Sequence, residues 1–443
     1  MTRIDNFSKS QKMIARLHEI VPGGGHTYSK GLDQFPYRSP QLITGAKGAY
    51  CVDVDGNRFL DWAMGNRVFI LGHGYPAVNE AVKNAIDVGV NYTRPGLLEL
   101  EVAEYLLDMH SWAGMVKFGK NGSDVTTAAI KLARAATGRE IVAICGDHPF
   151  FSTHDWFIGS TAMDAGTLQG EKRTTVKFRY NDMASVEALF AEYPGQIAAI
   201  ILEPVKNDAP VDGFLEGLRA IATRENAVLI FDEMIAGMRF HHLGAHHLYN
   251  VQPDLATFGK AVSNGFSFSF LIGAKEIMEL GGLMHDRSRV FLLSQTHASE
   301  TVGLAACRAT MEECIRNDVS THVWSTGKKL KDKFNALVKS VGVEDYVRII
   351  GFDCNPQILS THADGGYWPE LHTAFHEEVI AQGVLIPWIS ITWSHGDAEL
   401  EQTMKALEAG FNRVKRLLDE GGDVSTGYEG NAVQPVFRKY NNV

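Results

Sequence analysis

The chain has 443 residues, of which 45% are hydrophobic and 21% are charged, and its formal net charge is −10. This length allows two domains of roughly 100–250 residues each, and the composition is ordinary for a globular protein. The negative charge argues against a nucleic-acid-binding surface, and no apolar run approaches the roughly 20 residues that span a bilayer.

The N-terminus and the cysteines indicate the compartment. Residues 1–6 contain no apolar signal-peptide core. The five cysteines, at positions 51, 145, 307, 314 and 354, are scattered and form no CxxC pair. We therefore expect reduced thiols and a cytoplasmic location.

The first part of the chain predicts one helix and one hairpin. Residues 8–20 place apolar side chains at helical spacing, and Pro22-Gly23-Gly24-Gly25 ends this helix. Residues 50–57 predict a hairpin with an Asp-Gly turn.

From about residue 65 onward, short apolar runs alternate with stretches of helical periodicity. The expected strands are 115–118, 141–145, 175–178, 198–202, 227–231 and 255–258. The expected helices are 75–89, 98–109, 123–136, 184–192 and 214–225. This alternation predicts an α/β fold whose mostly parallel sheet has helices on both faces.

The last third of the chain predicts a smaller α+β domain. A long helix is expected at 299–316, before this domain, and a charged amphipathic helix at 320–340 follows it. The expected strands of the small domain are 347–350, 357–359 and 384–387, and its further helices are 368–382 and 397–418. The polar, Gly-rich tail 422–443 is expected to have little regular structure.

Lys260 and Asp232 each follow or end an apolar strand. Burial there lowers the pKa of a lysine and makes its amine a nucleophile suited to a Schiff base. A carboxylate at the end of an earlier strand is the partner that a protonated pyridine nitrogen needs. The pair indicates a pyridoxal-phosphate (PLP) enzyme. The alternative is a surface lysine in the turn before Ser263-Asn264-Gly265.

Other polar and aromatic residues also follow strands, at the edge where such sheets bind ligands. Asn121-Gly122-Ser123 opens a helix whose N-terminus can bind a phosphate, although Ser123 can also serve only as an N-cap. Phe150 can stack on a planar ring or pack in the core. Glu203 ends another apolar strand. Carboxylates at several strand ends must face a ligand, a cation or water.

The sequence lacks the motifs of other nucleotide- or metal-dependent enzymes. Gly259-Lys260 is not part of a P-loop, because residue 254 is Asp and residue 261 is Ala. No G-x-G-x-x-G fingerprint follows the first strand, and no H-E-x-x-H motif occurs. Four histidines at 241, 242, 246 and 247 lack a nearby cysteine or a well-spaced carboxylate, so we expect a solvated loop there and no metal site.

Taken together, these segments resemble the fold-type I, class III aminotransferases, and most of all the glutamate-1-semialdehyde 2,1-aminomutase branch. The similarity runs from Val21-Pro22-Gly23-Gly24 through 53–57 and Leu71-Gly72-His73 to the C-terminal domain. It implies an α/β fold with a seven-stranded type of sheet plus a smaller α+β domain. The implied segments are 1–65, which packs with the small domain, 66–320, which binds PLP, and 321–443.

The resemblance also implies roles for the cofactor residues. Lys260 would form the Schiff base with PLP, and Asp232 would partner the pyridine nitrogen. Asn121, Gly122 and Ser123 would hold the phosphate. Phe150 would stack on the ring.

Three further roles follow from the same resemblance. Glu203 and Ile235 match positions near the cofactor. Thr296 matches a threonine that reaches the phosphate of the neighbouring subunit, which implies a homodimer.

The substrate side departs from the family. Lys30 stands where the aminomutase branch has a carboxylate-binding arginine, and Arg67 lies in the turn where that branch carries a tryptophan. Tyr28 is a third candidate for substrate contact. The expected function is therefore amino-group transfer between a small amino donor and a carbonyl acceptor, by an aminotransferase or an aminomutase. A PLP-dependent decarboxylase or racemase, or a silent PLP-binding homologue, remains an alternative.

Overall fold

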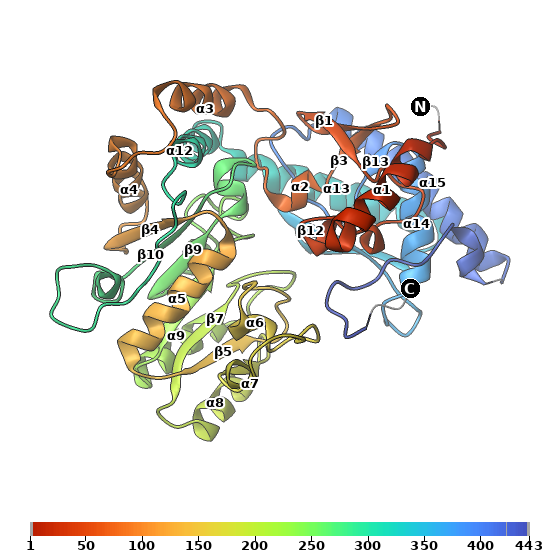
Figure 1. Ribbon diagram of the computed structural model, residues 1–443. Coiled ribbons are helices and arrows are strands. Elements are labelled where there is room, and N and C mark those ends of the chain that lie inside the picture. The colour runs from red at the N-terminus through yellow and green to blue at the C-terminus, as the bar shows by residue number, and fades with distance from the viewer. Residues whose placement is uncertain (1–2, 422, 441–443) are drawn as a thin grey trace. The chain divides into compact units, whose positions relative to one another are not determined.

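The computed structural model describes residues 3–421 and 423–440 and divides into two compact units (Figure 1). Unit 1 comprises Met1–Tyr75 and Thr321–Val436, and unit 2 comprises Pro76–Ser320 and Phe437–Val443. The boundaries of the three segments expected from the sequence remain a prediction.

Unit 2 is built on a seven-stranded sheet with the order β4-β10-β9-β8-β7-β5-β6. The strands are β4 (Met115–Gly119), β5 (Ile141–Cys145), β6 (Thr175–Phe178), β7 (Ile197–Leu202), β8 (Val228–Asp232), β9 (Leu255–Phe258) and β10 (Ser269–Gly273). β10 runs antiparallel to both of its neighbours, and the paired strands from β9 to β6 are parallel. Six of these strands were expected. β10 was not, because it follows β9 without an intervening helix and so breaks the alternating pattern.

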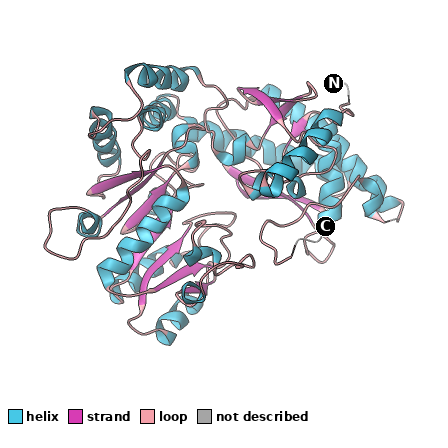
Figure 2. Cartoon of the chain, viewed as in Figure 1, coloured by secondary structure: helices cyan, strands magenta, loops and turns pink. Residues whose placement is uncertain are grey.

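Helices cover both faces of this sheet, as the alternation of buried side chains requires. Val142 and Ile144 of β5 belong to a core cluster with residues of α5 (Gly122–Thr137). Ala143 and Cys145 belong to a second cluster with residues of α9 (Phe214–Arg224). Figure 2 shows the magenta strands of unit 2 among its cyan helices. The predicted fold class is thereby confirmed.

The remaining helices of unit 2 are mostly short. They are α3 (Pro76–Val88), α4 (Leu97–Met109), α6 (Asp155–Ile158), α7 (Gln169–Lys172), α8 (Met183–Glu192), α10 (His246–Tyr249), α11 (Lys275–Met278), α12 (Thr301–Arg316) and the 3-10 turns η4 (Lys260–Ser263) and η5 (Glu279–Gly281).

Unit 1 contains two small sheets. The first has the order β1-β2-β3-β13 and the second is the β11-β12 hairpin. Its strands are β1 (Ile43–Lys47), β2 (Tyr50–Asp53), β3 (Arg58–Asp61), β11 (Val347–Phe352), β12 (Asn355–Ser360) and β13 (Val384–Leu385). The hairpin expected at 50–57 is present as β2 and β3, but its second strand lies beyond residue 57. β13 joins β3 in parallel.

The helices of unit 1 pack through aromatic side chains. The ring of Phe411 lies 5.0 Å from that of Phe334 and 5.6 Å from that of Phe375. The helices and turns are α1 (Ser8–Ile20), α2 (Met64–Arg67), α14 (Pro369–Ala381), α15 (Asp397–Asp419), η1 (Pro22–Gly24), η2 (Tyr28–Lys30), η3 (Leu32–Gln34) and η6 (Val424–Gly427). Helix α13 (Val319–Val341) begins in unit 2 and continues through unit 1. Within the described ranges, no helix is both long and apolar enough to cross a membrane.

Candidate active site

Asp232 and Lys260 lie at one edge of the unit 2 sheet. Asp232 is the register partner of Thr257 on the neighbouring parallel strand, and the Glu233 N–H donates to the Thr257 carbonyl at 2.9 Å. Lys260 comes directly after Gly259, at the first position of η4. Its φ of 49° is left-handed, which costs a non-glycine residue roughly 1–2 kcal/mol. Strain of this kind is concentrated at functional sites.

The Asp232 carboxylate is almost completely enclosed, with an exposed fraction of 3%. One oxygen accepts the Met234 N–H at 2.9 Å. Burial, together with the negative charge of Glu203, raises the pKa of Asp232 to about 7 against the opposing positive charge of Lys260. A carboxylate in such surroundings is stabilised in its ionised form by an additional cation.

The turn between β4 and α5 holds the predicted phosphate-binding residues. The Asp124 carboxylate accepts the N–H groups of Asn121 at 2.7 Å and Lys120 at 3.1 Å. The Ser123 hydroxyl accepts the Thr153 N–H at 3.0 Å, and Ser269 donates to the Asn121 carbonyl at 2.9 Å. Asp124 therefore fixes the turn, and Ser123 is tied to the loop after β5. This arrangement fits an anion at the N-terminus of α5.

Met234 brings three distant segments together. A Cβ atom added to Gly122 would lie 3.0 Å from the Met234 sulfur, and one added to Gly259 would lie 2.6 Å from it. The turn between β4 and α5 (which we call the phosphate turn, after its predicted role), the residues after Asp232 and the residue before Lys260 thus converge around one side chain. A side chain at 259 would have to displace the Met234 sulfur.

Glu203 and His148 lie beside this edge of the sheet. Both are buried, and the Glu203 N–H donates to His148 Nδ1 at 3.0 Å. Burial lowers the pKa of His148 to about 3, so its ring is neutral and the proton lies on Nε2. The Lys206 amine is 3.8 Å from a Glu203 carboxylate oxygen. The sequence reasoning missed His148, although its position after β5 is the signal that drew attention to Phe150.

The other cofactor candidates are less enclosed. Phe150 has an exposed fraction of 42%, and its ring meets Phe157 edge-on at 5.7 Å. Ile235 is half-buried. Thr296 is exposed, and its carbonyl accepts from the Asn91 side chain at 2.8 Å.

The three predicted substrate-contact residues do not belong to unit 2. Tyr28 and Lys30 are exposed at the two ends of η2, and Arg67 is half-buried at the end of α2; all three belong to unit 1. In the histidine cluster, His246 lies 2.8 Å from a Glu233 carboxylate oxygen. Within the described chain, no group of three or more histidine, cysteine, aspartate or glutamate residues is arranged to hold a metal ion.

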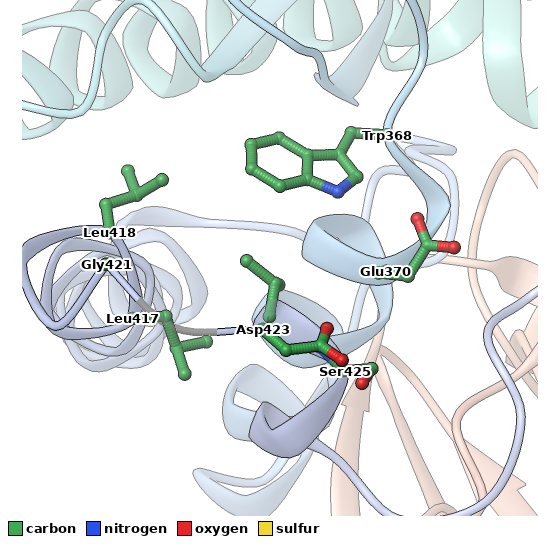
Figure 3. A pocket seen from close by; sticks show the side chains of 8 residues that line it. Trp368, Glu370, Leu417, Leu418, Gly421, Asp423 and Ser425 are labelled. Atoms are coloured by element: carbon green, nitrogen blue, oxygen red, sulfur yellow. The ribbon is translucent and has the colours of Figure 1, made fainter.

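A hollow of about 610 Å³ in unit 1 contains none of these candidates (Figure 3). It lies beside the start of α14 and the end of α15, and Trp368, Leu417 and Leu418 supply its apolar surface. The Asp423 carboxylate accepts the Ser425 N–H at 2.9 Å and so caps η6. Glu370, in the first turn of α14, supplies a second carboxylate to the hollow.

Comparison with known proteins identifies the family. A model of the class-III aminotransferases matches residues 36–388. Glutamate-1-semialdehyde 2,1-aminomutase from Hyperthermus butylicus is 30% identical over 92% of this chain and 99% of that protein. The 3-aminobutyryl-CoA aminotransferase of Cloacimonas acidaminovorans is 28% identical over 93% of this chain and 99% of that protein.

Solved structures share the fold. The Sphingopyxis sp. MTA144 FumI protein, solved in its PLP internal aldimine form, superposes with a TM-score of 0.84 at 23% identity, over 93% of this chain and 98% of that one. An omega-transaminase from Sphaerobacter thermophilus gives 0.82 at 24% identity, over 93% and 100%. The chain belongs to the class-III aminotransferase family. It is an enzyme of PLP-dependent amino-group transfer, which acts between an amino donor and a carbonyl acceptor.

Proposed function

We propose that Lys260 binds PLP and transfers the substrate's proton, and that Asp232 pairs with the pyridine nitrogen. The convergence of Gly122, Gly259 and the turn after Asp232 on Met234 carries this proposal. Through Met234, the N-terminus of α5, the segment after the buried Asp232 carboxylate and the residue before Lys260 lie close together. Bound PLP supplies an electron-accepting ring that stabilises the negative charge left when a proton leaves the substrate carbon.

Each of the cofactor residues then has a physical task. Asn121-Gly122-Ser123 binds the phosphate through the N-terminus of α5. Phe150 stacks on the ring and Ile235 packs near it. Glu203 adds negative charge near Asp232, which disfavours an unpaired Asp232 carboxylate and so favours a cation beside it.

Lys260 Nζ is the proton carrier. With PLP bound, the Lys260 amine would take the proton from the substrate carbon as a base and return it as an acid. The left-handed backbone at Lys260 sets the direction in which its side chain leaves the main chain.

Substrate recognition is assigned to unit 1. Tyr28, Lys30 and Arg67 are the proposed contacts, and the two cations suit an anionic group of the substrate. Relatives with the names aminomutase and aminotransferase both support the transfer chemistry. In the first case the amino group returns to the same molecule, and in the second it goes to another.

A homodimer is proposed for the assembly, with Thr296 reaching the phosphate of the neighbouring subunit. Thr296 is exposed. The residue before it, Gln295, lines a groove of about 510 Å³ together with Leu293 and with Leu100 of α4. Leu97 and Leu100 expose apolar side chains on the same helix. Apolar side chains gathered around a groove favour burial against another surface.

A cytoplasmic location is also proposed. All five cysteines are buried free thiols, and burial raises the pKa of Cys145 to about 12, which keeps it protonated and unreactive. Free thiols of this kind are typical of a reducing compartment.

A half-reaction screen tests the proposed chemistry. The PLP-loaded protein is mixed with amines and amino acids one at a time, and conversion to pyridoxamine phosphate is followed by absorbance. We expect at least one donor to convert the wild type and Lys275→Ala, which changes an exposed lysine on α11, at the same rate. Lys260→Ala should be slower by roughly 10²–10⁴-fold.

Two results would contradict the proposal. If no donor produces pyridoxamine phosphate while CO₂ or the opposite enantiomer appears, the reaction is decarboxylation or racemisation. If Lys260→Ala keeps the yellow absorbance of lysine-bound PLP after dialysis, another lysine holds the cofactor.

A further inference from the structure

A second cavity, of about 360 Å³, lies within unit 1. Its walls come from α14, from β12 and from the segments around Phe35 and Trp388, and Figure 1 labels both elements. Every lining residue belongs to unit 1, so the cavity is complete without unit 2. The volume falls in the range of roughly 300–1,000 Å³ that is typical of small-molecule sites.

The walls carry no charge. No lysine, arginine, aspartate or glutamate lines this cavity. Aromatic side chains supply flat apolar surface, and the rings of Phe35 and Trp388 lie 6.1 Å apart at an angle of 60°. A charged ligand would lose its hydration here without gaining a counter-ion, so the lining selects an uncharged one.

Two histidines of α14 supply hydrogen-bonding nitrogens. His372 and His376 are one helical turn apart, and their ring centroids are separated by 4.1 Å. His376 has an exposed fraction of 3%, and its Nε2 is buried with no hydrogen-bond partner in the described chain. Burial lowers the pKa of both histidines, to about 4 for His372, so both rings are neutral near pH 7.

Gln357 adds an amide to the same wall. It lies half-buried on β12, and its side chain forms no hydrogen bond with any described residue. The Gln34 amide, by contrast, donates to the carbonyl of Gln434, another lining residue, at 2.9 Å. An amide and a buried imidazole nitrogen without partners are groups that a ligand hydroxyl can satisfy.

We propose that this cavity binds an uncharged ring that carries hydroxyl groups. Its aromatic walls take the apolar faces of the ring, and His376 and Gln357 bond its hydroxyls. Sugars and phenols share this chemistry. A metal ion does not fit, because the histidine pair has no carboxylate or thiolate beside it to complete a coordination shell.

The test uses the intact, PLP-loaded protein with methyl α-glucopyranoside and phenol as two separate probes. Binding is measured by isothermal titration and by ligand-observed NMR. Gln357→Met keeps the side-chain length and removes both polar atoms, whereas His376→Phe removes the nitrogen and fills space. Gln196→Met, an exposed position in unit 2, is the control.

We expect saturable 1:1 binding of one probe, and the probe that binds identifies the ligand as sugar-like or phenol-like. Gln357→Met should weaken it roughly three- to tenfold, the worth of one hydrogen bond, and His376→Phe should weaken it further. Gln196→Met should bind as the wild type does. The proposal is overturned if neither probe saturates, or if a probe binds equally well to the wild type and to Gln357→Met. The second comparison holds even if His376→Phe disturbs the folding of unit 1.

Discussion

Asp232 and Thr257 are register partners on β8 and β9, so the buried carboxylate shares a sheet edge with the residues that lead to Lys260. Asp254 precedes β9 and lies at the opposite edge. There it accepts the Leu229 N–H at 2.7 Å and forms an ion pair with Arg219 at 2.9 Å. The two aspartates therefore belong to the same pair of strands but to opposite edges, which makes them a matched pair for substitution.

Asp232→Asn should lower kcat by roughly 10²-fold or more, because the ring nitrogen loses the charge that keeps it protonated. The KM for the amino donor should change little, since the substrate contacts are elsewhere. Steady-state kinetics with the best donor from the half-reaction screen measures both constants. Asp254→Asn should leave kcat unchanged and reduce stability through its lost ion pair. Equal losses of kcat in both variants would contradict the assignment of Asp232.

The raised pKa of Asp232 makes the stability of the cofactor-free protein depend on pH. Its pKa is about 7 in the folded chain, above the value of about 3.9 for an unfolded one, so the folded state binds more protons between these values. The contribution of Asp232 is fully present below about pH 4 and is lost as the pH rises through about 7.

Urea unfolding of the cofactor-free protein measures this dependence. Relative to the Asp232→Asn variant, which has no titrating group at this position, the wild type should lose stability as the pH is raised from about 5 to about 8. PLP should remove most of that difference, because its ring nitrogen offsets the buried charge. Parallel stability profiles for the wild type and the variant would show that Asp232 is already neutralised by Lys260.

Leu100→Glu should convert the proposed homodimer into monomers, since it places a charge in the groove beside Thr296. Sedimentation velocity at several protein concentrations measures the mass. Leu168→Glu is the control, because Leu168 is also exposed, at 67%, and lies outside that groove. A wild-type protein that sediments as a monomer, or a Leu100→Glu variant that keeps the dimer mass, would argue against this interface.

Six of the seven strands of the sheet, and the edge that carries the candidate site, could be predicted from local signals alone. Strands such as Ile141–Cys145 are short apolar runs bounded by helical periodicity, and Asp232 follows one of them directly. Polar residues that follow such runs fall at a common edge in any parallel sheet. For this reason the amino-acid pattern is enough to place Asp232 and Asn121 at that edge.

The turn at Met64–Arg67 could not be predicted in the same way. All four residues have positive φ, including Met64 at 47° and Arg67 at 65°. Asp61, just before the turn, accepts the N–H groups of Ala63 and Met64, at 2.9 and 3.0 Å. Trp388, far along the chain, donates to the Ala63 carbonyl at 3.0 Å. A local pattern cannot reveal a backbone that distant residues impose.

Met234 offers the sharpest test of the candidate site, because its sulfur fills the space next to Gly122 and Gly259. Gly259→Ala should lower the free energy of unfolding by about 1–3 kcal/mol and weaken PLP binding, since the new methyl group forces Met234 toward the phosphate turn. The φ of Gly259 is −175°, an extended conformation that alanine adopts freely, so the effect comes from crowding and not from the backbone. The double variant Gly259→Ala, Met234→Ala should recover PLP affinity relative to Gly259→Ala alone. Urea unfolding and PLP titration of the four proteins form a double-mutant cycle, and strictly additive effects would mean that Met234 does not couple Lys260 to the phosphate turn.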